Sequence, residues 1–177
     1  MRAACRSGVQ FPSFVAAIVL ASAAVAAAQP PSDKPVVSKA ATGTYVVFPN
    51  VPPCMTGKVE HGDPATGPSV LLVRANAGCT VPWHWHTPNE HVMMVSGTLQ
   101  LQMKGDAAPA VLRPGDYALA PAHHVHQARS TGASSFFLHS DGPFDLHYVD
   151  ASGNEVPAEQ VLKAKATGKP PAPAKKP

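Results

Sequence analysis

Between residues 45 and 150 the chain is divided into short apolar runs of three to seven residues, separated by glycine, proline, asparagine and aspartate. None of the runs keeps a helical period, and Leu99, Leu101 and Met103 alternate with polar residues, as in a strand with one buried face. The pattern predicts an all-β sandwich or barrel. The expected strands are residues 45–48, 69–75, 81–86, 91–95, 98–103, 110–112, 117–119, 125–128, 134–139 and 144–149.

The two ends of the chain differ from this middle part, which predicts one folded domain flanked by extended segments. Of the 177 residues, 29–44 are rich in Pro, Ser and Lys and indicate a linker. Residues 151–177 are rich in Pro, Ala and Lys and indicate a tail with one short helix over 158–165. No internal repeat is present, so the roughly 110 residues of the expected domain, 45–150, form one barrel around one core.

The first 28 residues have the three parts of a secretory signal peptide. Arg2 and Arg6 form a basic start, residues 14–28 form an uncharged apolar run, and three alanines at its end suit cleavage before Gln29. A membrane anchor is the alternative, but fifteen apolar residues are short for a span of about 20. We expect a periplasmic or secreted protein with no membrane span after cleavage.

The charge of the expected domain argues against a nucleic-acid partner. The whole chain has a formal net charge of +3, but residues 29–160 hold seven basic and eleven acidic side chains. This part is mildly acidic and lacks the basic stripe that nucleic-acid binding requires.

Two cysteines remain after the expected cleavage, Cys54 and Cys79. An even pair in an oxidising compartment is a disulfide candidate. Two buried free thiols are the alternative, because a disulfide requires a geometry that the sequence does not show. We predict the disulfide, which would tie the first segment of the domain to the strand that precedes His84.

All nine histidines lie between residues 61 and 147. His84 and His86 are two residues apart, so on a strand their imidazoles point to the same side with a spacing that suits one ion. A turn then brings Glu90 back at the start of the next strand, and His126 follows a second turn and strand. Three imidazoles and one carboxylate suit one divalent transition metal: Mn, Fe, Co, Ni, Cu or Zn.

These residues resemble the two sequence motifs of the cupin superfamily. The first motif, G-x5-H-x-H-x3-E-x6-G, is matched at every defined position, and the second, G-x5-P-x-G-x2-H-x3-N, is matched in part. The chain departs from the second motif at His123, where the family usually has glycine, and at Ser130, where it has asparagine. The matched positions are Gly78, His84, His86, Glu90, Gly97, Gly115, Pro121 and His126.

The resemblance covers residues 70–140 closely and 45–150 loosely. In detail the sequence is similar to a subgroup of small bacterial cupins of undefined function. It implies a single-domain, jelly-roll-like conical β-barrel with one open end. It also implies one metal on His84, His86, Glu90 and His126, and it favours a homodimer, because cupin barrels often pair.

Strand parity predicts which other residues line the metal cavity. Val92 and Met94 share the inward face of their strand with Glu90 and would form an apolar wall. His124 shares strand parity with His126, which makes it the candidate pocket residue and the nearest candidate base. The remaining histidines are expected at edges or on the surface.

Three functions fit such a centre. The metal could carry a reaction on a small oxygen-rich ligand such as a diketone, a catechol or a 2-oxo acid, with a dioxygenase as the first choice and an isomerase or decarboxylase next. It could hold such a ligand without turnover, in a periplasmic binding or sensing module. It could also only lock the barrel, as closed structural sites do. A cavity beside the metal would favour the first two.

Overall fold

The structure is a computed structural model that describes residues 34–167. The predicted signal peptide and the last ten residues of the predicted tail lie outside the described residues. The chain divides into two units, Met1–Pro35 and Val36–Pro177, and the fold below is that of the second. Its elements are β1 (Met55–Gly62), β2 (Ser69–Ala75), β3 (Thr80–Trp85), β4 (Glu90–Ser96), β5 (Leu99–Met103), β6 (Ala110–Leu112), β7 (Tyr117–Ala120), β8 (His126–Ser130), β9 (Ser134–Ser140), β10 (His147–Tyr148) and α1 (Ala158–Thr167).

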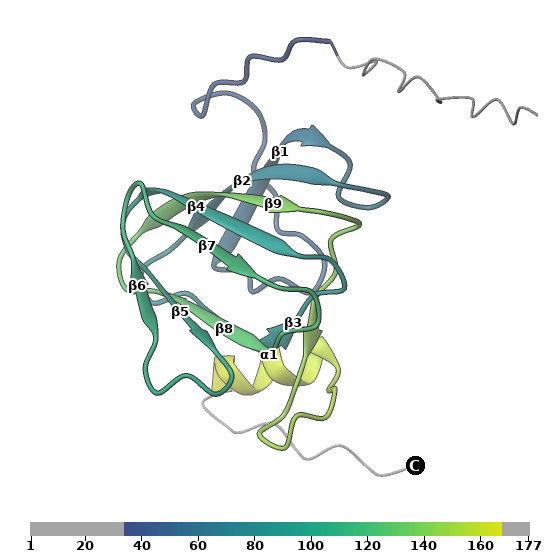
Figure 1. Ribbon diagram of the computed structural model, residues 1–177, viewed down its shortest axis with the longest axis vertical. Coiled ribbons are helices and arrows are strands. Elements are labelled where there is room, and N and C mark those ends of the chain that lie inside the picture. The colour runs from purple at the N-terminus through teal and green to yellow at the C-terminus, as the bar shows by residue number, and fades with distance from the viewer. Residues whose placement is uncertain (1–33, 168–177) are drawn as a thin grey trace, which may run out of the picture. The chain divides into compact units, whose positions relative to one another are not determined.

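The strands form two five-stranded sheets that lie one above the other (Figure 1). One sheet has the order β1-β2-β9-β4-β7 and the other β10-β3-β8-β5-β6, and the pairs within both are antiparallel. Partners such as β4 and β9 are distant in the chain, so each sheet is assembled from separate segments. The predicted all-β jelly roll is confirmed.

Nine of the ten predicted runs overlap strands, and the first does not. In residues 45–48 only Val46 pairs, through an isolated bridge to Gly57. The sequence analysis missed β1, whose apolar pattern is broken by glycines, a lysine and a glutamate and whose register shifts between Val59 and His61. As an edge strand paired with β2, β1 takes its position from backbone hydrogen bonds more than from an apolar face.

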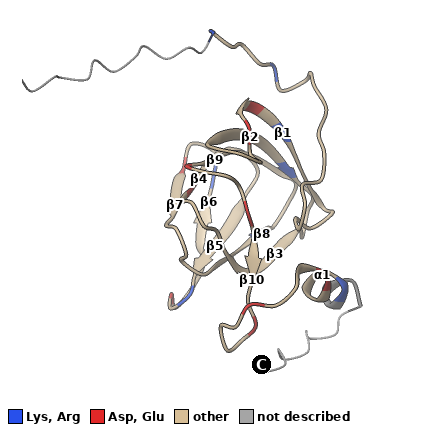
Figure 2. Cartoon of the chain, turned by 90° about the vertical axis from the view of Figure 1, so that its right-hand side faces the viewer, with Lys and Arg blue, Asp and Glu red and all other residues tan. Residues whose placement is uncertain are grey.

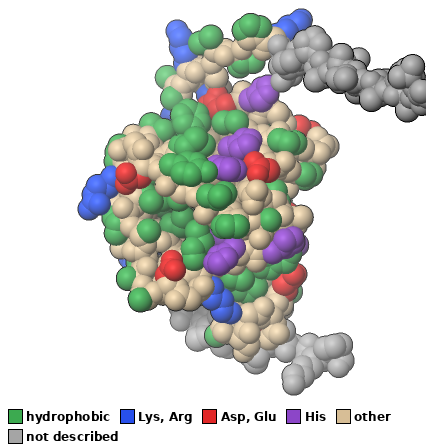
Figure 3. Space-filling view, viewed as in Figure 1, with side chains coloured by type: hydrophobic (Ala, Val, Ile, Leu, Met, Phe, Trp, Pro, Cys, Tyr) green, Lys and Arg blue, Asp and Glu red, His purple; other side chains and the backbone are tan. Residues whose placement is uncertain are grey.

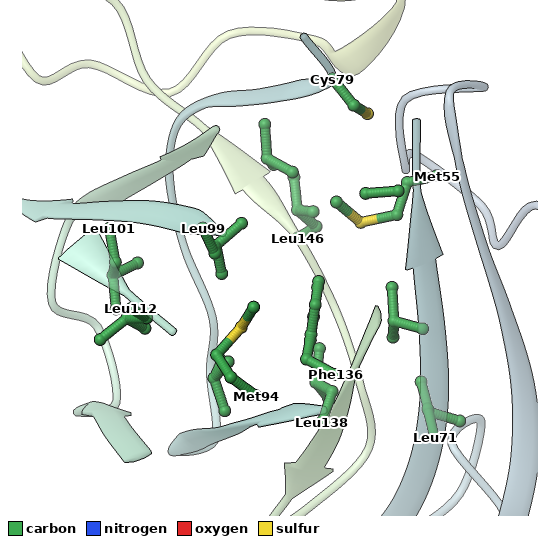
Figure 4. Close-up of a cluster of buried hydrophobic side chains, with 14 of the residues drawn as sticks. Met55, Leu71, Cys79, Met94, Leu99, Leu101, Leu112, Phe136, Leu138 and Leu146 are labelled. Atoms are coloured by element: carbon green, nitrogen blue, oxygen red, sulfur yellow. The ribbon is translucent and has the colours of Figure 1, made fainter. Parts of the chain in front are cut away.

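Both sheets send alternate side chains into one core (Figure 4). Along β9 the buried residues alternate with partly exposed ones, so that Phe136 and Leu138 point inward. Leu99 and Leu101 of β5 meet them from the other sheet, as their period of two predicted. The core therefore lies between the sheets, and inward parity decides which polar residues are buried with it.

The fold continues past the predicted boundary at residue 150. Val156 and Val161 are both 6% exposed and belong to the core cluster, and α1 contacts β10. The backbone N–H of Val156 donates to the carbonyl of Tyr148 at 2.9 Å, which fastens the segment before α1. The helix agrees with the prediction within two residues, but the boundary of the domain was placed too early, because two isolated valines are a weak signal in a proline-rich segment.

The segment predicted as a linker is attached to β1. The Lys58 ammonium is 6% exposed and donates to Ser38 Oγ and to the carbonyls of Lys39 and Thr42, at 2.9–3.1 Å. A buried ammonium needs such acceptors, because an unpaired charge away from water is costly. The described part of this segment is therefore fastened to the barrel by Lys58, and Arg74 of β2 adds a hydrogen bond to the carbonyl of Ala40 at 3.0 Å.

The cysteine pair and the surface complete the fold. Cys54, just before β1, is bonded to Cys79, just before β3. Charged residues of both signs are scattered along the strands, the turns and α1 (Figure 2). No helix within residues 34–167 is long and apolar enough to cross a membrane.

Gly97 is the position where the turn after β4 demands a glycine. Its φ is +75°, and a Cβ there would overlap the carbonyl oxygen of Ala133. We predict that Gly97→Ala lowers the free energy of unfolding by about 1–3 kcal/mol from backbone strain, with the overlap adding to this loss. Chemical denaturation measures the change. Gly132→Ala is the matched control, because a Cβ there meets nothing within 4 Å, and equal effects of the two changes would contradict the prediction.

Candidate metal centre

A β-bulge in β3 aims His84 into the barrel. Val81 pairs with Ala128 and His84 pairs with His126, so three residues of β3 span two residues of β8. The extra residue turns His84 to the same side as Val81, although an odd spacing would otherwise place them on opposite faces. His84 thus lies directly opposite His126, and His86 follows just beyond the end of β3.

Glu90 reaches the same point from the other sheet. It is the first residue of β4, which lies between β9 and β7, and its alternation with exposed neighbours directs the carboxylate inward. Glu90 Oε2 is 3.3 Å from His126 Nε2 and 3.6 Å from His86 Nε2. The carboxylate therefore joins the histidine cluster across the interior of the barrel.

The three imidazoles form a compact buried group. His84, His86 and His126 are 1–3% exposed, and their nearest ligand atoms all lie within 4.8 Å of one another. With Glu90, which is 8% exposed, they could hold one metal ion. The side chains that the sequence analysis assigned to the metal thus meet at one point.

Each of the three imidazoles is oriented by a backbone carbonyl. A ring that donates its Nδ1–H in this way keeps the lone pair of Nε2 free for an ion. The three Nδ1 atoms lie 2.6 Å from the carbonyl oxygen of Pro82 for His84, 2.8 Å from that of His124 for His126, and within hydrogen-bond reach of that of Asp145 for His86.

Two of the Nε2 atoms show that the residues fit a metal. The Nε2 atoms of His86 and His126 are buried and make no hydrogen bond. Buried polar atoms without a partner are uncommon in folded proteins and call for a missing ion or water. An ion held between these nitrogens and the Glu90 carboxylate would satisfy both.

The protonation states at this point also suit a metal. Burial alone would raise the pKa of Glu90, but the imidazoles of His86 and His126 hold it well below its usual range. Burial, helped by the two neighbouring imidazoles, lowers the pKa of His84 well below its usual value. At neutral pH Glu90 is therefore a carboxylate and His84 a neutral imidazole, the forms that bind metals. Burial lowers the pKa of His86, but the Glu90 carboxylate outweighs this and raises it, so a metal that binds here would displace the proton that His86 shares with Glu90.

Residues 71–140 match the family of the cupin domain. This part of the chain is a cupin domain. A stretch of 79 residues is 30% identical to part of the DNA damage-repair/toleration protein DRT102 of Arabidopsis thaliana. The matched stretch makes up 45% of this chain and 26% of that protein. The chain thus spans about a quarter of the curated relative that it matches.

Solved structures share the barrel. An acetylacetone dioxygenase from Acinetobacter johnsonii is 17% identical, with a TM-score of 0.55 over 80% of this chain and 96% of that one. An RmlC-like cupin from Shewanella frigidimarina NCIMB 400 is 15% identical, with a TM-score of 0.50 over 60% of this chain and 88% of that one. At such identities the likeness shows the fold alone.

Of the three predicted pocket residues, the structure places only Val92 in the wall of the cavity. Val92 lines the cavity next to the cluster, and Met94 is buried in the core but does not line it. His124 is exposed, so its side chain does not line the cavity and cannot be the base proposed from parity. The parity argument failed because β8 begins only at His126, so His124 lies in the turn before the strand and contributes its carbonyl instead.

The departure of this cupin domain at His123 leaves the turn intact. His123 has a φ of 59°, the left-handed conformation that the glycine of the motif would adopt easily. Its ring lies against Trp85, with centroids 4.8 Å apart, on the outer side of β3. The backbone therefore keeps the conformation that leads into β8.

The sequence analysis missed two contributors from the segment between β9 and β10. The Asp145 carbonyl orients His86, and the Phe144 ring lies against it, with ring centroids 5.1 Å apart. The Asp145 carboxylate in turn accepts a hydrogen bond from the backbone N–H of Thr87 at 2.8 Å, which holds the segment over the turn after β3. A backbone carbonyl leaves no signature in side-chain identity, so the sequence offered no signal for this contact.

Removing one ligand should separate metal binding from folding. We predict that His86→Ala lowers metal affinity by at least about 100-fold, since the loss of a mere supporting hydrogen bond already costs about 10- to 100-fold. Metal at 100 times its dissociation constant for the core centre should add about 2.7 kcal/mol to the stability of the unchanged chain, and the core of the variant should gain at most about 0.4 kcal/mol at the same concentration. Calorimetric titration and melting with and without a chelator measure both. His61→Ala is the control, and equal metal loss in the two variants would contradict the assignment.

Proposed function

We propose that this cupin domain holds one divalent transition metal (Fe, Mn, Ni, Cu, Co or Zn) at His84, His86, Glu90 and His126 and uses it to bind and oxidise a small oxygen-rich organic ligand. The observation that carries the proposal is the pair of buried Nε2 atoms that make no hydrogen bond and face the buried Glu90 carboxylate at 3.6 and 3.3 Å. A bound metal would supply Lewis acidity and dioxygen chemistry, with coordination positions left over for the ligand.

The walls of the cavity favour oxidation over reactions that need a protein base. Among the described residues that line it, only the four proposed ligands are titratable, and the others are apolar or aromatic. An isomerase or decarboxylase commonly relies on a separate acid or base within hydrogen-bond reach of its substrate. The described residues offer none inside this inner cavity, whose apolar walls would exclude water, and Asp145 and His147 line only the outer pocket.

Access to the centre is controlled by two side chains. The inner cavity measures about 40 Å³, enough for an ion or a few waters but far below the roughly 300–1,000 Å³ of small-ligand sites. An outer pocket of about 420 Å³ shares Phe144 and Leu146 with it, and this volume lies in the usual range for small ligands. We infer that an organic ligand occupies the outer pocket and reaches the metal when Phe144 turns aside.

The second candidate is a binding or sensing module without turnover. The absence of a separate base among the lining residues described supports it as well, because sequestration needs only the metal and the pocket. For either function we propose a periplasmic or secreted location. The disulfide between Cys54 and Cys79 supports this location, since such bonds persist in oxidising compartments.

Oxygen consumption distinguishes the two candidates. We predict that iron-loaded protein consumes dioxygen when given a diketone or a catechol, and acetylacetone is the first compound to test because the dioxygenase with a similar fold is named for it. The His84→Ala variant should lose this activity, because it lacks a ligand to the metal. An oxygen electrode measures the rate. If the loaded protein binds the compound in a calorimetric titration but consumes no oxygen, the binding module is correct; if it does neither across the panel, both candidates fail.

Truncating Phe144 should open the route to the metal. We predict that Phe144→Ala speeds the removal of bound metal by a chelator, because the ring no longer separates the outer pocket from the inner cavity. Stopped-flow absorbance with a coloured chelator measures the rate. Phe137→Ala is the matched control, since Phe137 lies on the outward-facing parity of β9. An unchanged rate in Phe144→Ala would show that the metal exchanges by another path.

A further inference from the structure

A second group of metal-ligating side chains lies on the outer face of the sheet that carries Glu90. It consists of His91 of β4, His139 of β9 and Asp141 just after β9, and one ligand atom of each lies within 4.8 Å of the others. Histidine side chains gather beside an acidic one on the face where β4, β7 and β9 lie (Figure 3). The proposed function of the core does not use them.

The strand register brings these residues together. His91 and His139 are direct partners in the antiparallel pairing of β4 with β9, so their side chains stand next to each other on one face. Asp141 follows His139 by two residues and lies on the same side. The two histidines are thus held by regular strands, whose backbone is more rigid than that of a loop.

The spacing of the ligand atoms suits a small cation. Asp141 Oδ1 is 3.1 Å from His91 Nε2 and 3.4 Å from His139 Nδ1. Two ligands that bind zinc tetrahedrally at 2.0–2.2 Å are about 3.3–3.6 Å apart. The two Asp141 pairs are therefore close to the spacing of zinc ligands, and the two imidazole nitrogens, which lie within 4.8 Å of each other, would approach to complete the site.

Neighbouring groups hold two of the ligands in place. The other ring nitrogen of His91, Nδ1, lies 2.7 Å from the hydroxyl of Tyr117, and the other oxygen of Asp141 accepts a hydrogen bond from Asn89 Nδ2 at 2.8 Å. Such partners set the orientation of metal ligands and strengthen them. The side chains of His91, His139 and Asp141 are 23–39% exposed, so ions and coordinating waters can reach them.

We propose that His91, His139 and Asp141 form a second, solvent-accessible site for a divalent transition cation, with Zn²⁺ as its best-suited ion. Two imidazoles and one carboxylate are the ligand types of zinc sites that keep a position open for water. The site is separate from the core centre, because Glu90 points inward and His91, the next residue of β4, points outward. The alternative is an ion-pair network in which Asp141 pairs with its two histidines and no metal binds.

Zinc titration tests the site independently of the core. In the His86→Ala background, to which His84→Ala is added so that only His126 and Glu90 remain in the core, calorimetry with Zn²⁺ alone should show one zinc per chain. Adding His139→Ala should weaken this binding by at least about 10-fold, and Tyr117→Phe should weaken it by about 10-fold through loss of the partner of His91. His61→Ala in the same background should leave it unchanged.

Two further measurements keep the test decisive. If the chain with both core changes does not fold, the same titration of the otherwise unchanged chain should count two zinc ions per chain, and one after His139→Ala. When Cu²⁺ replaces zinc in the background that lacks core ligands, electron paramagnetic resonance should show coupling of the copper to two ligand nitrogens, those of His91 and His139. No zinc binding in a folded chain with both core changes, or binding that His139→Ala leaves intact, would overturn the proposal and leave the core centre unaffected.

Discussion

The burial of the Glu90 carboxylate between the two sheets is the constraint on which the rest of this structure depends. A carboxylate taken out of water costs several kcal/mol unless partners compensate for it. Here the partners are imidazoles of His86 and His126, which come from the opposite sheet. The register of β3, β8 and β4 must therefore be correct in all three strands, because a slip by one residue in any of them would turn its metal-site side chain outward.

The geometry that compensates for this carboxylate also creates the proposed function. The bulge in β3 places His84 opposite His126, and backbone carbonyls orient the rings so that two Nε2 atoms remain buried without a hydrogen bond. A barrel selected only for stability would gain by satisfying or removing such atoms. Their presence in an otherwise apolar cavity is best explained by an ion that binds there.

The two proposed sites lie on opposite faces of the same strands, because side chains alternate between the two faces along each strand. On β4, Glu90 points to the core and His91 to solvent, and on β9 the same alternation places His139 beside His91. The inner group is buried and in our proposal supplies four ligands, whereas the side chains of the outer group are 23–39% exposed and would supply three. The same strands thus present metal ligands of different accessibility on their two faces.

The sequence alone determined the all-β fold, nine of the strands and the residues that meet at the core centre, because apolar alternation and the spacing of His84, His86 and Glu90 are local properties of the chain. Tertiary structure decided what depends on other segments: the edge strand β1, the carbonyl of Asp145 behind His86, the exposure of His124 and the packing of Val156 and Val161. It also decided that His91 and His139, 48 residues apart, are neighbours. Strand pairing over such distances is set by the packing of whole sheets, which no local pattern encodes.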